Sequence, residues 1–227
     1  MELKDGVWLL PLRGRPAGLK RLIRSVQATE PEARVVAILD EGDPECGVLE
    51  EMLERAGWAW FPLFGSPSTV VKLNAGVEMC PDEGFYGLLA SDIEPQTVGW
   101  GKALAAACPP FGLSYCDDSI HQRNLPTHPC VSGELVRALG WWAYPKAMHN
   151  GVDIYLYEVA SLAGGAEYVE GHSFMHHHHS AGRAAPDELT QRVAAWGESD
   201  RIASIVWKDK DGVLAAMRVR KVQQCRK

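Results

Sequence analysis

Five of the eight histidines of this chain lie between His172 and His179, and four of them form the uninterrupted run 176–179. Neutral imidazole is a common metal ligand, so a cluster of this density suggests a metal site. The alternative is a polar loop that happens to be rich in histidine. Patterned sequence continues after the run as far as Lys227, which indicates that these histidines belong to the fold rather than to a purification tag.

A carboxylate pair in the stretch GLLASDIEPQTVGWG (87–101) forms a second group of candidate ligands. Asp92 and Glu94 follow an apolar run and are two residues apart. In extended backbone residues i and i+2 point to the same side, so both carboxylates can face one cation. Mg²⁺ and Mn²⁺ prefer such oxygen ligands. The alternative is a turn in which Asp92 caps the following segment.

Alternating strand and helix patterns must position these residues. Short apolar runs predict strands, and amphipathic or capped stretches between them predict helices. We expect strands at 7–12, 33–40, 59–64, 84–90, 111–118 and 166–179, and helices at 13–27, 48–57, 68–79, 98–108, 133–143, 150–165 and 186–200. Pro16, Gly57 and Ser132 are placed as a first-turn proline, a C-terminal stop and an N-cap. The alternation predicts an α/β fold with a mostly parallel central sheet flanked by helices.

Ligand sites of such sheets lie beyond the carboxyl ends of the strands. Arg13 and Arg15 follow the first predicted strand, Asp40 ends the second, and Asp92 with Glu94 follows the fourth. Neither G-x-G-x-x-G nor G-x-x-x-x-G-K-[ST] occurs, so a P-loop and the usual dinucleotide fold are unsupported.

The composition, with 46% apolar and 23% charged residues, is that of an ordinary globular protein. No apolar run is long enough for a membrane helix, no signal peptide is evident, and the six cysteines show no C-x-x-C pair. We therefore expect a cytoplasmic protein with reduced thiols. The net charge is −6, but the last ten residues, RVRKVQQCRK, contain five basic side chains and no acidic one. They are either a solvated tail or a contact for a polyanion.

The chain resembles a nucleotide-sugar glycosyltransferase of the GT-A type, in particular the short versions of bacteriophages and bacteria. The resemblance spans residues 7 to 190. It is carried by the order and spacing of PLRGRPAGLKRLIRS, VVAILDEGDPE, VVKLNAG, ASDIEPQTVGWG, ALGWW, HNGVD and HHHHSAGRAAPDE. ASDIEPQTVGWG stands in place of the family's D-x-D segment. Its second acid is Glu94 rather than Asp, which puts the geometry of the ion in doubt.

The resemblance implies roles for particular residues. Asp92 and Glu94 would hold a Mn²⁺ or Mg²⁺ ion that bridges the diphosphate. His176 and His178 would complete the metal shell, with His176 the preferred ligand and His177 and His179 pointing away. Five other positions would contact the nucleotide sugar: Arg13, Arg15, Asp40, Lys72 and Asn74. The structural alternatives are surface charge for the basic residues and a turn cap for Asp40.

Asp153 is the candidate general base of an inverting transfer, because it begins a predicted helix shortly after His149. The alternative is that it favours the positive N-terminal end of that helix. We expect a glycosyltransferase domain at 1–190, with a nucleotide-sugar half at 1–108 and an acceptor half at 109–190. A helical, basic extension at 191–227 follows. A UDP-sugar is the expected donor, and the rival functions are a nucleotidyltransferase and a non-catalytic nucleotide- or carbohydrate-binding module.

The resemblance to phage enzymes suggests that the acceptor is a hydroxyl of a hydroxymethylated pyrimidine in phage DNA. The protein would then modify DNA in the cytoplasm of the host. A polysaccharide, a protein and a small molecule are the alternatives. Contacts with DNA phosphates would come from the C-terminal residues Arg218, Arg220, Lys221, Arg226 and Lys227. Trp141 or Trp142 could stack on an extruded base, although paired aromatic residues are more often part of a core.

Overall fold

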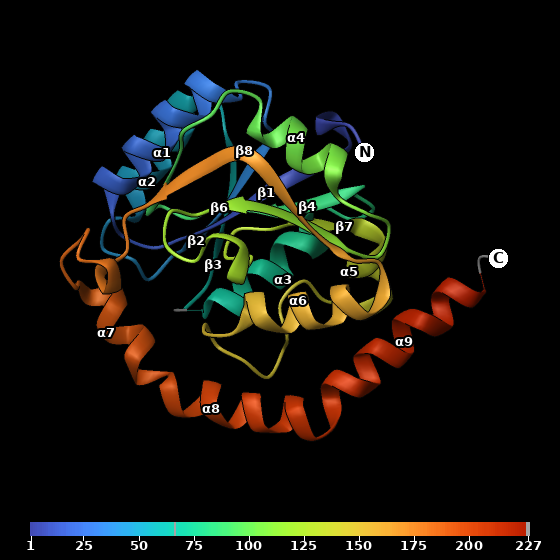
Figure 1. The fold of residues 1–227 in the computed structure, drawn as a ribbon. Helices are drawn as coiled ribbons and strands as arrows, with labels where there is room; N and C mark the ends of the chain where they lie inside the picture. The colour runs from blue at the N-terminus through green and yellow to red at the C-terminus, as the bar shows by residue number, and fades with distance from the viewer. Residues whose placement is uncertain (66, 226–227) are drawn as a thin grey trace.

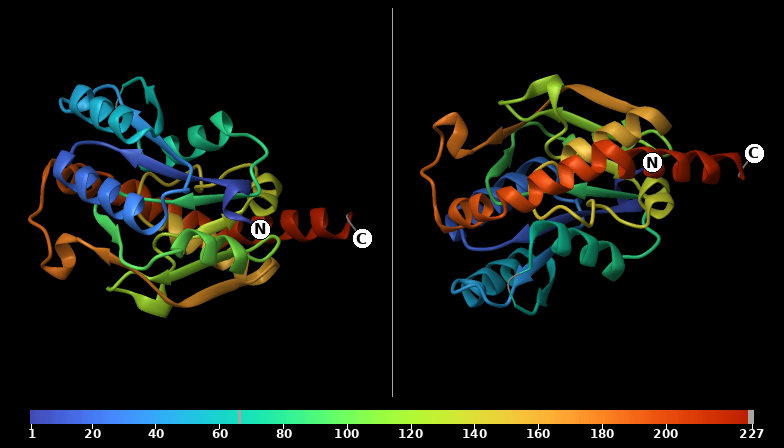
Figure 2. Two further views of the ribbon diagram at one scale, coloured as in Figure 1. Left: turned by 90° about the horizontal axis from the view of Figure 1, so that it is seen from above. Right: turned by 90° about the horizontal axis from the view of Figure 1, so that it is seen from below.

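The computed structural model describes residues 1–65 and 67–225, in which one eight-stranded sheet lies between two layers of helices (Figures 1 and 2). The strands are β1 (Gly6–Leu12), β2 (Val35–Asp40), β3 (Ala59–Leu63), β4 (Phe85–Leu88), β5 (Ile93–Pro95), β6 (Leu113–Asp117), β7 (Cys130–Ser132) and β8 (Ala166–His176). The helices are α1 (Pro16–Thr29), α2 (Cys46–Ala56), α3 (Thr69–Met79), α4 (Trp100–Ala107), α5 (Gly133–Leu139), α6 (Val152–Ala163), α7 (Glu188–Ala195), α8 (Gly197–Val206) and α9 (Gly212–Gln224). A five-residue π-helical turn, Trp207–Asp211, joins α8 to α9.

The strand order is β3-β2-β1-β4-β7-β6-β8-β5. Strands β3, β2, β1 and β4 are parallel to one another, and β6 is parallel to β8. Strand β7 runs antiparallel to β4 and β6, and β5 runs antiparallel to β8. The expected α/β class and its parallel half are confirmed. The short strands β5 and β7 were not expected, because three residues are too few to produce a recognisable alternation of apolar and polar side chains.

The sheet has a separate hydrophobic core on each face. In β1 the alternation of side chains sends Val7 and Leu9 into one core and Trp8 and Leu10 into the other. Helices α3, α5 and α6 cover the first face, with α8 and α9 packed outside α5 and α6, and α1, α2 and α4 cover the second face (Figure 1). Both faces of the central strands are buried, which explains why these strands read as continuous apolar runs.

The signals for helix ends are confirmed. Pro16 is the first residue of α1. Ser132 caps α5, since its hydroxyl accepts a hydrogen bond of 3.1 Å from the backbone N–H of Leu135. Gly57 ends α2 in the left-handed conformation, with φ of 72°. Each of these signals acts within one turn of helix, so the local sequence is sufficient to predict it.

Helices α7, α8 and α9 form an arc along one side of the molecule (Figure 1). The helix expected at 186–200 is divided between α7 and α8. Arg218, Arg220 and Lys221 are exposed on α9, whereas Arg226 and Lys227 lie outside the described residues. The C-terminal end of α9 lies at the opposite end of the molecule from the segment 177–187 (Figures 1 and 2). Among the described residues, no helix has the length and apolar character needed to cross a membrane.

Gly87 in β4 provides a test of this packing. A Cβ atom at Gly87 would lie 2.1 Å from the ring of Trp8, which is fully buried and cannot move aside. Gly87→Ala should lower the free energy of unfolding by roughly 1–3 kcal/mol through overpacking. The control is Gly47→Ala in α2, where a Cβ meets nothing within 4 Å and should stabilise by about 0.4–1 kcal/mol. Urea denaturation measures both, and equal effects of the two substitutions would contradict the packing described.

Candidate functional site

The candidate site lies beyond the carboxyl ends of β1, β2 and β4. Gly14 and Arg15 both adopt left-handed conformations, with φ of 58° and 59°, and turn the chain from β1 into α1. This turn sends the Arg15 side chain to Asp92, and Arg15 Nη1 lies 3.0 Å from Asp92 Oδ2. Gly18 allows α1 to approach the turn that contains Asp92, because a Cβ at Gly18 would lie 2.3 Å from the carbonyl oxygen of Ser91.

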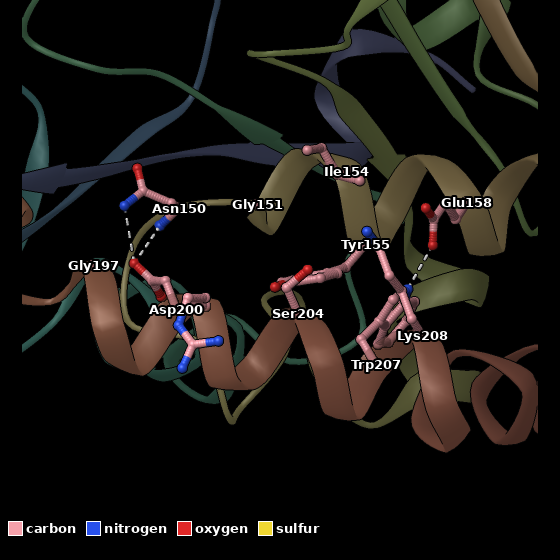
Figure 3. A pocket seen from close by; sticks show the side chains of 11 residues that line it. Asn150, Gly151, Ile154, Tyr155, Glu158, Gly197, Asp200, Ser204, Trp207 and Lys208 are labelled. Atoms are coloured by element: carbon pink, nitrogen blue, oxygen red, sulfur yellow. Dashed lines mark hydrogen bonds between the residues drawn. The ribbon is translucent and has the colours of Figure 1, made fainter.

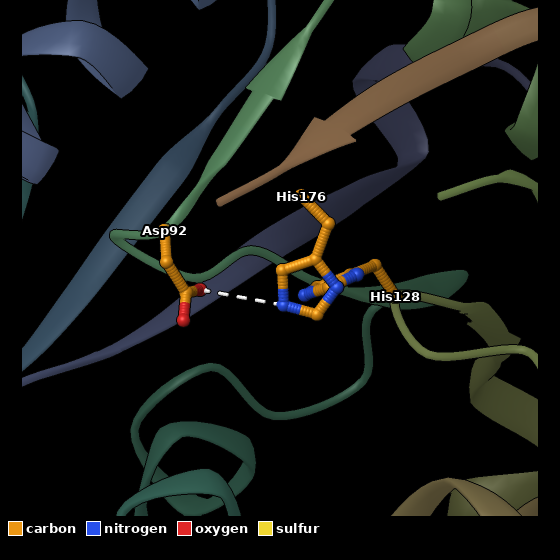
Figure 4. A group of neighbouring side chains, drawn as sticks. All are labelled: Asp92, His128 and His176. Atoms are coloured by element: carbon orange, nitrogen blue, oxygen red, sulfur yellow. Dashed lines mark ion pairs between the residues drawn. The ribbon is translucent and has the colours of Figure 1, made fainter. Parts of the chain in front are cut away.

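Asp92, His128 and His176 converge in this region (Figure 4), and one potential metal-ligating atom of each lies within 4.8 Å of the other two. Nε2 of His176 is 3.9 Å from Asp92 Oδ1, and the rings of His128 and His176 are 5.0 Å apart at their centroids. A distance of 3.9 Å is too long for a hydrogen bond. Two bonds of about 2.0–2.2 Å to a shared cation can span it. The three residues therefore have the donor atoms and spacing of a metal centre.

The protonation states favour metal binding. Burial of His128, together with the neighbouring His176, lowers the pKa of His128 to about 3, so its imidazole is neutral with a free lone pair. Nδ1 of His128 lies 3.1 Å from the Thr127 hydroxyl, which leaves Nε2 as the candidate donor. Burial opposes ionisation of Asp92, but the neighbouring His176 and Arg15 outweigh it and the pKa of Asp92 is lowered.

Asp118, which directly follows β6, orients His176 through the ring nitrogen Nδ1. Its Oδ2 lies 3.5 Å from His176 Nδ1 and 2.8 Å from His121 Nδ1, and it accepts a 3.0 Å hydrogen bond from Thr127. Burial opposes the ionisation of Asp118, but these hydrogen bonds keep its pKa well below the usual range. A carboxylate on the far nitrogen fixes the tautomer and direction of a ligating histidine. Asp118 and His128 were both missed from the sequence, although the acidic end of the strand 111–118 was a signal of the same kind as Asp92.

Two predicted metal ligands lie outside this group. Oε2 of Glu94 is 3.0 Å from Nε2 of His177, on the other side of the β5–β8 pair. His178 uses Nδ1 to contact the hydroxyl of Ser180 at 2.7 Å, and its ring is 5.2 Å from that of His176. Asp92 lies in a turn before β5 rather than in the strand, so the alternation expected for residues 92 and 94 does not apply.

The predicted phosphate-binding arginines are held by acidic residues of the segment after β8. Arg15 makes two hydrogen bonds to Asp187, of 2.6 and 3.0 Å. Arg13 bonds to Glu188 at 2.9 Å and to Asp40 at 2.7 Å. The hydrogen bonds from Arg15 hold the pKa of Asp187 well below its usual range. The segment 177–187 is thus fastened by charge to the turn that follows β1.

Asp40 lies at the centre of a second charged group. Its side chain is fully buried, and Oδ2 faces Arg13, Arg192 at 3.4 Å and Lys72 at 3.9 Å. Nζ of Lys72 also donates a 2.9 Å hydrogen bond to the carbonyl of Leu12. Burial lowers the pKa of Lys72 to about 8, although Asp40 acts in the opposite direction. Three basic side chains thus surround one buried carboxylate next to the predicted nucleotide site, and one of them, Arg13, is shared with Glu188.

Asn74 and Trp142 have structural contacts. The Asn74 side chain accepts 2.9 Å hydrogen bonds from the backbone N–H groups of Trp142 and Ala143 and donates one to the carbonyl of Ala143. Trp142 is fully buried, and its indole N–H donates to the carbonyl of Tyr86. Trp142 is therefore part of the hydrophobic core and does not form a stacking surface. This agrees with the alternative interpretation of paired aromatic residues given from the sequence.

Asp153 begins α6 and is partly buried, with its carboxylate near the charges of His121 and Asp118. Burial raises the pKa of Asp153, which makes the carboxylate a stronger base. Its Oδ1 accepts a hydrogen bond of 2.9 Å from the backbone N–H of Ile154. His149 does not share a helical face with Asp153, because it lies in the loop before α6. There its Nδ1 lies 2.6 Å from the Thr69 hydroxyl.

The loop before α6 is fixed by a carboxylate of the C-terminal extension. Asp200 in α8 accepts hydrogen bonds of 2.6, 3.2 and 2.9 Å from the backbone N–H groups of Met148, His149 and Asn150. The side-chain amide of Asn150 adds a fourth at 3.0 Å (Figure 3). This contact borders a cavity of about 390 Å³ between α6 and α8. The extension therefore sets the backbone from which α6 and Asp153 start.

No protein-family model and no curated protein matches the sequence. Solved structures do match the fold. Mannosyltransferase PcManGT from Pyrobaculum calidifontis, in complex with GDP-Man and Mn²⁺, covers 96% of this chain with a TM-score of 0.62 at 9% identity. The chain has the GT-A fold. Its GT-A sheet carries the Asp92, His128 and His176 group at the carboxyl edge.

Two further matches support the GT-A fold. GalNAc-T7 with UDP, GalNAc and Mn²⁺ has a TM-score of 0.58 at 13% identity over 75% of this chain. S. aureus TarS in complex with UDP has a TM-score of 0.58 at 11% identity over 74% of this chain. The matched regions are 43% and 60% of those two chains and 73% of PcManGT. This GT-A chain thus spans less than two thirds of the first two proteins.

The metal group predicts a response to Mn²⁺ alone. At a concentration 100-fold above its Kd, Mn²⁺ should stabilise the protein by about 2.7 kcal/mol, or roughly 5–10 °C in Tm for a domain of this size. Asp92→Ala, His128→Ala and His176→Ala should each abolish the Mn²⁺-dependent rise, because each removes a donor. His177→Ala, which removes the neighbouring imidazole bound to Glu94, is the control. Loss of the response in His177→Ala and its retention in His176→Ala would contradict this assignment.

The contact of Asp200 predicts a local effect in the loop 148–150. Asp200→Ala should lower the free energy of unfolding by roughly 2 kcal/mol or more, since buried N–H groups lose a charged acceptor. Hydrogen exchange of the Met148, His149 and Asn150 amides should accelerate. Arg201→Ala removes only an exposed pair with Glu198 and should change stability by less than about 1 kcal/mol. Unchanged exchange in Asp200→Ala would contradict the positioning role.

Proposed function

We propose that this chain is a metal-dependent glycosyltransferase that moves a sugar from a nucleoside-diphosphate sugar to an acceptor hydroxyl. The observation that carries the proposal is the meeting of Asp92, His128 and His176 at the carboxyl edge of a GT-A sheet. Two similar structures, GalNAc-T7 and PcManGT, contain Mn²⁺ together with UDP or GDP-Man. The position and donor atoms of the three residues fit the same kind of site.

Mn²⁺ is the proposed ion, because the structures of GalNAc-T7 and PcManGT contain it. Mg²⁺ prefers oxygen ligands, whereas imidazole nitrogen suits transition metals. A set of two imidazoles and one carboxylate therefore fits Mn²⁺ better than Mg²⁺. When bound, the cation would neutralise charge on the leaving diphosphate. Glu94 and His178, the other ligands suggested by the sequence, contact His177 and Ser180 instead.

A UDP-sugar or GDP-sugar is the proposed donor. The guanidinium of Arg15 lies beside Asp92, so a diphosphate held at the metal centre comes within reach of an Arg side chain. Arg13 and Asp40 lie at the ends of the adjoining strands β1 and β2, and Lys72 approaches Asp40 from α3. The three side chains supply charge on the nucleoside side. Asn74 supports this region through the segment 142–143 rather than from the nucleotide pocket itself.

Asp153 is the proposed general base. The acceptor oxygen attacks the anomeric carbon of the sugar, and a new C–O bond forms while the bond from that carbon to the diphosphate oxygen breaks. The acceptor proton passes to the Asp153 carboxylate, and the nucleoside diphosphate leaves with the bonding electrons. Asp153 must be ionised for this step, so transfer should fall as pH decreases through its raised pKa.

Two features of the structure bear on the class of acceptor. The exposed basic residues of α9 lie at the far end of the molecule from the segment 177–187, and Trp142 is buried. These positions give no support to DNA over a polysaccharide, protein or small molecule. Hydroxymethylpyrimidine DNA is therefore one arm of the acceptor test rather than a second proposed function.

The test is a thermal-shift screen of UDP-, GDP- and CDP-sugars with and without Mn²⁺, followed by product analysis with candidate acceptors that include hydroxymethylpyrimidine DNA. A glycosyltransferase releases nucleoside diphosphate and adds one sugar mass to the acceptor. Pyrophosphate release would identify a nucleotidyltransferase instead. Donor binding without turnover by any acceptor class would favour a non-catalytic module and count against the proposal.

Asp153→Asn should reduce transfer by about 100-fold or more while leaving the donor- and Mn²⁺-dependent thermal shift unchanged. The amide keeps the shape of the carboxylate but cannot accept a proton. Initial rates and the pH profile, measured beside the wild type with the best donor from the screen, check this. Near-normal transfer by Asp153→Asn would remove Asp153 from the role of base and point to a retaining mechanism or another base.

A further inference from the structure

The outer face of α8 and α9 is apolar. Five large hydrophobic side chains on this face are between 46% and 61% exposed: Ile202, Ile205, Val213, Leu214 and Met217. The inner face is buried against the core through Ala203, Trp207 and Val219. A helix pair that is apolar on its inner and its outer side is unusual for a surface element, because one of the two faces has no packing partner among the described residues.

The exposed side chains share one direction. In Figure 3 Asp200, Ser204 and Trp207 face α6, and Ile202 follows Asp200 by two residues, or about 200° around the helix. The π-helical turn Trp207–Asp211 adds about one residue to the repeat. With this insertion the chain from Ile202 to Met217 spans about fourteen α-helical steps, which is close to four turns, so these two side chains point in similar directions. Helical periodicity therefore places the five residues in one stripe along α8 and α9, with Val213 at its edge beside α6.

Basic side chains flank the stripe. Lys208, Lys210, Arg218, Arg220 and Lys221 are exposed on the same two helices and the turn between them. Of the four acidic residues of this segment, Asp200 is buried against the loop 148–150, Glu198 is paired with Arg201, and Asp211 is paired with Lys146. Asp209 is exposed between Lys208 and Lys210. Residues 197–227 contain eight basic and four acidic residues, whereas the whole chain has a net charge of −6.

We propose that the apolar stripe of α8 and α9 rests on an anionic lipid surface. Partial insertion of aliphatic side chains combined with attraction of flanking lysines and arginines to lipid headgroups is the usual means of interfacial binding. A second copy of this chain would bring two sets of basic side chains together across the stripe. A nucleic acid would attract the charges but gain little from five aliphatic groups. Only an anionic bilayer complements both features.

The proposal is independent of the glycosyltransferase activity. It does not require a membrane-spanning helix, since the stripe lies along the surface of the helices. The apolar and the charged contributions should act together, so that either neutral vesicles or a stripe made polar gives weak binding. This double requirement makes the proposal testable with the full chain.

The test is co-sedimentation of the full chain with phosphatidylcholine vesicles that contain about 30 mol% phosphatidylglycerol. Binding should be at least about tenfold weaker to pure phosphatidylcholine vesicles and should decrease at high salt. The variant Ile202→Ser/Ile205→Ser/Met217→Ser should lose binding about tenfold or more. Val98→Ser is the matched control, because Val98 is 78% exposed but lies outside α8 and α9. Circular dichroism and the Mn²⁺-dependent thermal shift verify that the variants are folded.

Three outcomes would overturn the proposal. One is the absence of binding to anionic vesicles. Another is a concentration-dependent dimer, without vesicle binding, that the triple serine variant abolishes, since a second copy would then cover the stripe. The third is retention of duplex DNA by the wild type and the triple serine variant alike, without vesicle binding, which would assign the basic residues to a polyanion contact.

Discussion

The antiparallel pairing of β5 with β8 is the contact on which the candidate site depends. Ile93 is paired with His176, and the backbone N–H of His177 donates a hydrogen bond of 2.7 Å to the carbonyl of Asp92. These few backbone bonds bring a turn after β4 and the end of the last strand to the same place. Without these bonds the distance between Asp92 and His176 would not be fixed. His128 and Arg15, which approach His176 and Asp92, would then not be brought to one site.

The pairing also explains which parts of the site the sequence could predict. Asp92 follows a predictable strand, so the rule that ligands bind at carboxyl ends was enough to select it as a candidate. His176 was singled out by the dense histidine run, and its role as a ligand was implied by the resemblance to GT-A glycosyltransferases. Glu94 was grouped with Asp92 by assuming extended backbone, but Asp92 lies in a turn and Glu94 faces His177. His128 precedes a three-residue strand that has no periodic pattern. Its approach to His176 is a long-range property of the mixed half of the sheet.

The fold shows the same division between local and long-range information. The parallel strands, the first turn at Pro16 and the cap at Ser132 follow from short stretches of sequence. The role of Asp200 could not be predicted in this way, because its partners at 148–150 are distant in sequence. They are backbone N–H groups, which are present in every residue type except proline. Tertiary hydrogen bonds to the main chain leave no motif in either partner.

The bidentate contact between Arg15 and Asp187 has a consequence for anion selectivity. Asp187 is a tethered competitor, and its effective concentration at Arg15 is on the order of millimolar or higher. A free anion such as inorganic phosphate must outcompete this internal carboxylate with one group alone. A ligand that contacts Arg15 and a second residue of the site at the same time gains binding energy from both contacts, so it displaces Asp187 more easily. The ion pair between Arg15 and Asp187 therefore weakens the binding of small anions such as phosphate more than the binding of larger anions with several contact points. It makes the site more selective without any additional contact to the ligand.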